Sequence, residues 1–76
     1  PPLTKEQTPC YIDHHLRIVG RKDPIFDKNA ITAIHQNAMG RPRVINTLAI
    51  KAMTIGAIEK KDLLTEEEVY RASQES

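Results

Sequence analysis

The sequence contains no tryptophan and few other aromatic residues, with one phenylalanine and two tyrosines among 76 residues. It therefore lacks the row of stacking side chains on which proteins bind single-stranded bases. Charge of either sign is also not in excess, because eleven basic residues stand against ten acidic ones. This balance excludes a polybasic nucleic-acid arm, and the apolar patches of the chain exclude a disordered acidic tail. No apolar run approaches the ~18–20 residues of a membrane span, so we expect no membrane contact by this segment.

Cysteine is almost absent too, since Cys10 is the only one. A single cysteine excludes an internal disulfide and fits the reducing environment of the cytoplasm. A chain of this length is one domain at most and buries only roughly 60–65% of the surface that it would expose unfolded. Because it begins at Pro1 and its core must be thin, we expect residues 1–76 to be one domain cut from a longer protein.

What the sequence does have is helical spacing of apolar residues, in four segments. The first is predicted over residues 8–19, with Thr8 as N-cap, Pro9 at the first helical position and Gly20 as the stop. An alternative start at Thr4 would close a capping box with Gln7 and leave Pro9 one turn inside. The apolar stripe of this helix is Tyr11, Ile12, His15, Leu16 and Val19.

The second helix is predicted to begin after Asp27 as N-cap, beyond a polar loop broken by Pro24, and to end at Gly40. Phe26 and Ile31 are spaced as a hydrophobic staple. The face expected to be buried is Ala30, Ile31, Ile34 and Ala38.

The third helix is predicted from Pro42 to about Lys60 and is apolar on nearly every side, which is typical of a central helix. The fourth has the clearest start, because Thr65 and Glu68 form a capping box and Leu64 and Val69 the matching staple. We expect Val69 and Ala72 to face inward. Four helices and no strand predict an all-α fold, a small four-helix bundle.

The main candidate for a functional site is the turn between the second and third helices. Arg41 and Arg43 lie at the start of the central helix, where the macrodipole disfavours cations but free backbone N–H groups attract anions. Cations at such a position indicate a phosphate site. The alternative is that these are two solvated surface arginines beside a turn.

The other candidate residues are weaker. His14 and His15 are adjacent, so on a helix they diverge and cannot share a metal as a pair; a zinc site would also need His35 and a further ligand. We therefore predict no metal site. Cys10 has no evident partner for nucleophilic catalysis and is predicted to be a small buried residue.

The remaining polar and sulfur-containing residues have structural interpretations. Lys60 and Lys61 end the third helix, where cations suit the dipole, and a DNA contact is a secondary reading. The glutamates at positions 66–68 are read as helix-start electrostatics rather than as ligands. Met39 and Met53 are predicted to lie in the core.

A family resemblance adds to this reading. The run Gly40-Arg41-Pro42-Arg43-Val44-Ile45-Asn46 resembles the sensor 2 motif of AAA+ ATPases, as found in branch-migration motors and in ExeA-like secretion and transposition ATPases. The start of the chain, the residues Pro24-Ile25-Phe26 and the closing acidic helix resemble the ExeA-like lid as well. The resemblance covers nearly the whole chain.

The resemblance implies that residues 1–76 form the C-terminal helical lid of an AAA+ ATPase, active in DNA transposition or DNA targeting. Arg43 would be the sensor arginine that reaches the terminal phosphate, and Arg41 a second contact. Pro42 would aim the helix and Gly40 would permit the turn, so these four residues form the expected nucleotide-binding set. Asn46 would support the motif by hydrogen bonding.

The implied cofactors are ATP and Mg²⁺ in the full-length protein. The isolated chain has no Gly-x-x-x-x-Gly-Lys-Ser/Thr loop, so we expect it to bind no cofactor and to hydrolyse nothing by itself. The implied partners are its own P-loop domain and neighbouring subunits of a homo-oligomer, with DNA and a transposase as further candidates. A stand-alone helical DNA- or protein-binding module and the lid of a secretion-assembly ATPase remain alternatives.

Overall fold

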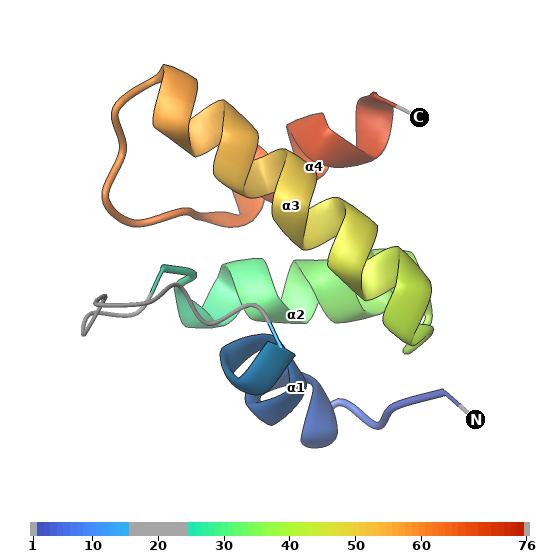
Figure 1. The fold of residues 1–76 in the computed structure, drawn as a ribbon. Coiled ribbons are helices and arrows are strands. Elements are labelled where there is room, and N and C mark those ends of the chain that lie inside the picture. Colours follow the sequence, from blue (N-terminus) through green and yellow to red (C-terminus); the bar gives the residue numbers. More distant parts are fainter. Residues whose placement is uncertain (1, 16–24, 76) are drawn as a thin grey trace.

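The computed structural model describes residues 2–15 and 25–75, without the side chains of residues 13–15. In these ranges the chain forms four helices and no strand: α1 (Gln7–His15), α2 (Lys28–Ala38), α3 (Pro42–Ile58) and α4 (Glu66–Gln74). The predicted all-α bundle is therefore confirmed. Helices α2, α3 and α4 pack against one another, and α1 packs against α2 and α3 (Figure 1).

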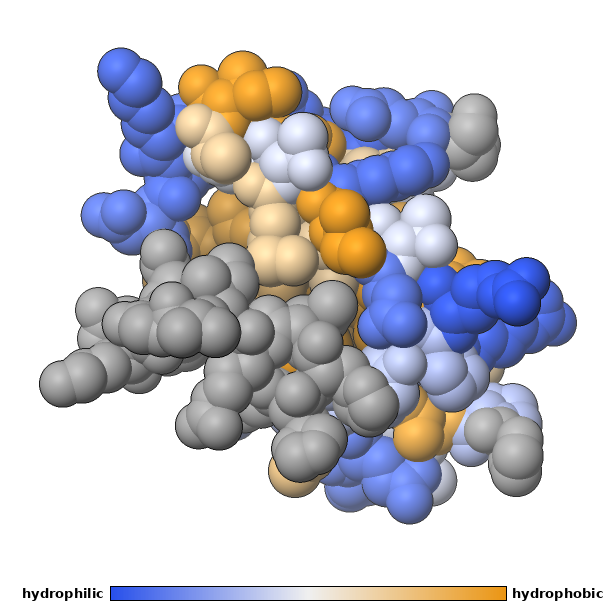
Figure 2. All heavy atoms as spheres, viewed as in Figure 1, coloured by the Kyte–Doolittle hydropathy of each residue, from blue (hydrophilic) through white to orange (hydrophobic). Residues whose placement is uncertain are grey.

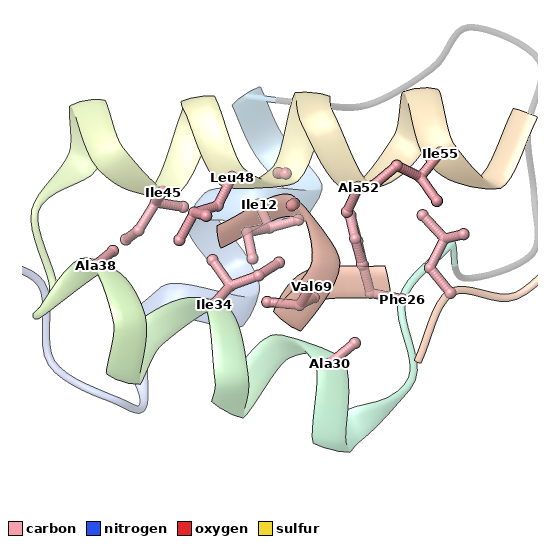
Figure 3. Close-up of a cluster of buried hydrophobic side chains, with 13 residues drawn as sticks. Ile12, Phe26, Ala30, Ile34, Ala38, Ile45, Leu48, Ala52, Ile55 and Val69 are labelled. Carbon is pink, nitrogen blue, oxygen red and sulfur yellow. The ribbon is translucent and has the colours of Figure 1, made fainter. Parts of the chain in front are cut away.

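The core lies between α2 and α3 and is closed by Ile12 of α1 and by Val69 and Ala72 of α4. In Figure 3, Ile34 of α2 and Ile45 of α3 point toward each other, and Val69 of α4 enters between the two helices. Alanines at several contact points let the helix backbones approach closely. The buried apolar set is Ile12, Phe26, Ala30, Ile34, Ala38, Ile45, Leu48, Ala49, Ala52, Ile55, Leu64, Val69 and Ala72.

Helix α1 begins earlier than the preferred prediction. Thr4, not Thr8, supplies the cap: its N–H donates to Oε1 of Gln7 at 2.9 Å, and the Gln7 N–H donates to its hydroxyl at 3.2 Å. This is the alternative capping box, which satisfies two donors where a start at Thr8 would satisfy one. Thr8 is instead inside the helix and fully buried. The predicted positions Leu16, Val19, Gly20 and Pro24 lie outside the described residues.

Buried Thr8 ties α1 to α2. Its hydroxyl lies 3.0 Å from the carbonyl oxygen of Thr4 and 2.7 Å from Nδ1 of His35. Cys10 is exposed, so its predicted burial is wrong. The reason is helical geometry, since residues two apart point to nearly opposite sides and the flanking Thr8 and Ile12 take the buried side.

The starts of α2 and α4 are as predicted. The Asp27 side chain accepts from the N–H of Ala30 at 2.7 Å, and Thr65 and Glu68 make both bonds of a capping box. Phe26 and Leu64 are buried just before the two helices. Ile31 packs against the core without being fully buried, and Val69 and Ala72 face inward as expected.

Phe26 and Leu64 also bring the two helix starts together. The N–H of Leu64 donates to the carbonyl of Ile25 at 2.7 Å, and the N–H of Asp27 donates to the carbonyl of Leu64 at 3.0 Å. These bonds form an isolated parallel bridge between Phe26 and Leu64. Sequence analysis missed the bridge because its two segments are far apart along the chain.

Helix α3 ends two residues before the predicted Lys60. Lys60 has φ 57°, and the N–H of Lys61 closes back onto the carbonyl of Gly56 at 2.9 Å. This left-handed closure completes the helix end without a glycine. As predicted, α3 contacts every other helix, but α2 does so too. Part of its apolar surface is exposed, at Ile50 and Ile58, and apolar residues lie along α3 on the face seen in Figure 2.

The two methionines differ in position. Met53 is partly buried against the core, close to the prediction. Met39 is 68% exposed, so the prediction of a core position is wrong for it. It follows Ala38, the last residue of the buried stripe of α2, and its left-handed backbone (φ 55°) already belongs to the helix end.

Candidate functional site at the turn between α2 and α3

The turn that precedes α3 is built around Gly40. This glycine is buried and has φ +74°, a conformation that side chains disfavour. A Cβ atom there would lie 2.4 Å from the carbonyl oxygen of Leu3. Both the backbone conformation and the space therefore require glycine, which agrees with the role expected for Gly40.

The N-terminal segment holds this turn in place. The N–H of Leu3 donates to the carbonyl of Gly40 at 2.6 Å, and the Leu3 side chain packs against the core. Within the turn, the N–H of Arg41 donates to the carbonyl of Ala38 at 3.0 Å. Residues that the sequence separates by almost forty positions thus fix the direction in which α3 begins. Sequence analysis gave no indication of this contact.

Arg41 and Arg43 are both exposed at the start of α3. Arg41 is the N-cap, with an extended backbone and no side-chain capping bond, and Pro42 is the first helical residue as predicted. Neither guanidinium has an ion pair or a hydrogen bond with the part of the chain that the structure describes. The structure therefore brings the two cations to one helix start, where neither has a partner among the described residues.

The backbone at the same place adds free donors. The first bond into the helix runs from the N–H of Ile45 to the carbonyl of Arg41 at 2.9 Å, and Pro42 has no N–H. The N–H groups of Arg43 and Val44 consequently have no acceptor within the described residues. The first turn of α3 holds no acidic residue, whereas α2 and α4 have carboxylate or hydroxyl caps. Free N–H groups, the positive end of a helix dipole and two guanidinium groups suit an anion such as phosphate.

Asn46 lies one turn further along α3. Its Oδ1 atom is buried and accepts no hydrogen bond from any described residue. The expected support of the turn therefore does not come through this oxygen.

A second charged cluster lies at the start of α4 and is structural. Glu68 is fully buried, and its carboxylate accepts from Nζ of Lys61 at 2.6 Å and from the N–H of Thr65 at 2.7 Å. Burial by itself would raise the pKa of Glu68, but the hydrogen bonds from Lys61 and Thr65 outweigh it and lower this pKa to about 2. The hydrogen bond to Glu68 likewise raises the pKa of Lys61. The capping box predicted the Thr65 contact, and the pairing with Lys61 was missed.

The histidines and the cysteine form no common site in the described region. His35 is half-buried beside Thr8, and exposed Cys10 is on a different helix. The side chains of His14 and His15 lie outside the described residues. Among the described side chains, no group of three or more His, Cys, Asp and Glu residues could hold a metal ion.

Comparisons with known proteins give no relative. No family model, no curated protein and no solved structure matches this chain. In addition, none of the helices within the described ranges has the length and apolarity that crossing a bilayer demands. The functional interpretation of the turn therefore depends on its own geometry and on the motif resemblance.

Proposed function

We propose that this chain is the helical lid of an AAA+ ATPase and that Arg43 contacts the terminal phosphate of ATP bound to a separate P-loop domain. The observation that carries the proposal is the uncapped start of α3. There Arg43 has no partner among the described residues, and its own N–H and that of Val44 lie beside it without acceptors. In the sensor 2 motif, which residues 40–46 resemble, an arginine is required at this place.

The turn suits a phosphate but does not suit a metal ion. The first turn of α3 contains no carboxylate, so Mg²⁺ would be held by the P-loop domain and by the phosphates themselves. Arg43 would act on the negative charge of the phosphate oxygens as the terminal phosphoryl group leaves. Arg41, exposed at the N-cap, is placed for a second contact to nucleotide or to a neighbouring subunit. The proposed context is transposition or DNA targeting.

The proposal is tested by replacing Arg43 in the full-length protein. Arg43→Ala should lower the ATPase turnover number at least about tenfold, because it removes a charge-assisted hydrogen bond made to the transition state. Arg43→Lys keeps one charge and should recover only part of the loss, since lysine lacks the planar fork of donors. Steady-state ATPase rates at saturating ATP are the measurement.

Lys28→Ala is the matched control, because Lys28 is also an exposed cation in a first helical turn but belongs to α2. It should leave turnover within about twofold of the wild type. The melting temperature of each variant shows whether the fold is retained. Unchanged turnover in a folded Arg43→Ala protein would overturn the proposal.

A further inference from the structure

A groove lies between α2 and α4, and none of its lining residues belongs to the turn that carries Arg43. It is open to solvent and has a volume of about 430 Å³. The lining residues come from both helices and are Ala33, Gln36, Asn37, Glu66, Glu67 and Tyr70. None of them is a cation, and only Ala33 is aliphatic.

Neither of the two carboxylates of the groove forms an ion pair with a described residue. Glu66 and Glu67 are exposed and take part in none of the ion pairs between described residues. The cations nearest along α4 and its preceding loop are already engaged, because Lys61 pairs with Glu68 and Arg71 pairs with Glu59. Among the described residues, Lys61 and Arg71 act on Glu67 through space without forming an ion pair with it, so the groove presents two carboxylates to solvent.

Tyr70 gives the groove an aromatic surface. It follows Glu66 by four residues and Glu67 by three, so the three side chains share one side of α4. The residue is 64% exposed, so its ring is accessible from solvent. On α2, the Nδ2 of Asn37 donates to the carbonyl oxygen of Ala33. The side-chain oxygen of Asn37 therefore remains as an acceptor.

Carboxylates, an amide oxygen and an exposed aromatic ring together match one chemical group well. A guanidinium group is planar, stacks on aromatic rings and donates to carboxylates through a fixed fork of N–H groups. We propose that the groove between α2 and α4 binds an arginine side chain presented by a basic segment of a partner protein. Because the groove exceeds the size of one side chain, residues flanking the arginine also enter it.

The test is a titration of the ¹⁵N-labelled chain with an acetylated and amidated peptide, Ala-Arg-Ala-Arg-Ala-Arg, followed by NMR. Shift changes should be confined to residues 33–37 and 66–70. The same peptide with citrulline in place of arginine keeps the shape and loses the charge, so it should bind at least about fivefold more weakly. Glu67→Gln and Tyr70→Ala should each weaken binding of the arginine peptide to a similar degree.

Glu75→Gln is the matched control, because it removes an exposed carboxylate next to α4 but outside the groove. It should leave the affinity unchanged. Equal weakening by Glu75→Gln, or equal binding of the citrulline peptide, would overturn the proposal. So would shift changes at the groove that grow with protein concentration in the absence of peptide, because these would identify a second copy of the chain as the occupant. The outcome is independent of the role proposed for Arg43.

Discussion

Single residues decide where the candidate phosphate site faces. Gly40 leaves just enough room for the carbonyl of Leu3, and the resulting contact holds the end of α2 and the start of α3 at a fixed angle. The role of Gly40 could be predicted from its position between two helices. Its neighbour Leu3 could not, because nothing local in the sequence relates the two residues.

Replacing Gly40 measures this contact. Gly40→Ala should destabilise the chain by about 2 kcal/mol, since the new Cβ meets the Leu3 carbonyl and the backbone has a positive φ. Urea unfolding followed by circular dichroism gives the change in the free energy of unfolding.

Deleting residues 1–3 separates the clash with the Leu3 carbonyl from the strain of the positive φ. In the shortened chain the contact with Leu3 is gone, so Gly40→Ala should cost only about 1 kcal/mol, the strain of a left-handed alanine. An equal loss in both chains would show that the N-terminal segment does not hold the turn.

At the scale of elements, the local sequence was sufficient to predict a helix start where only one residue could serve as the N-cap. The starts of α2 and α4 were predicted correctly from Asp27, Thr65 and their staples. The start of α1 was not, because Thr4 and Thr8 both have the side chain of a cap and the choice depends on burial of Thr8 against His35. The burial of Glu68 was also missed, because it depends on a tertiary contact, the pairing of its carboxylate with Lys61.

Glu68 makes the attachment of α4 sensitive to acid. Its pKa of about 2 is below the ordinary value of 4.5, so the carboxylate is more favourable in the folded chain than in the unfolded one. The stability that it contributes is present above about pH 5 and is lost as the pH falls toward 2. Glu68→Gln keeps an oxygen for the Thr65 N–H but loses the charge, and should cost about 2 kcal/mol at pH 7.

Melting temperatures between pH 7 and pH 2.5 check this prediction. The wild type should lose stability across that interval, and Glu68→Gln should lose clearly less. The control is Glu67→Gln, which removes an exposed carboxylate from the same turn of α4 and should melt with the pH dependence of the wild type. An unaltered acid sensitivity in Glu68→Gln would contradict the role of the buried pair.

At the scale of the whole molecule, the described helices share one core, and the turn with Arg43 is attached to it at both ends. The proposed lid would move as one body and bring Arg43 to the nucleotide. The number of helices and the position of the arginine turn could be predicted from spacing and from Gly40 and Pro42. Contacts such as the Phe26–Leu64 bridge could not, because they exist only once the helices are packed.

The most direct test of the account is the preference of the full-length protein for ATP over ADP. If Arg43 contacts the terminal phosphate, Arg43→Ala should weaken binding of a non-hydrolysable ATP analogue by roughly tenfold or more, the value of one charge-assisted hydrogen bond. Binding of ADP, which lacks that phosphate, should change less than about twofold. Calorimetric titration of wild type and variant with both nucleotides gives, for each nucleotide, the ratio of the variant's dissociation constant to that of the wild type. An equal loss for ATP and ADP, or no loss for either, would contradict the assignment of Arg43 to the terminal phosphate.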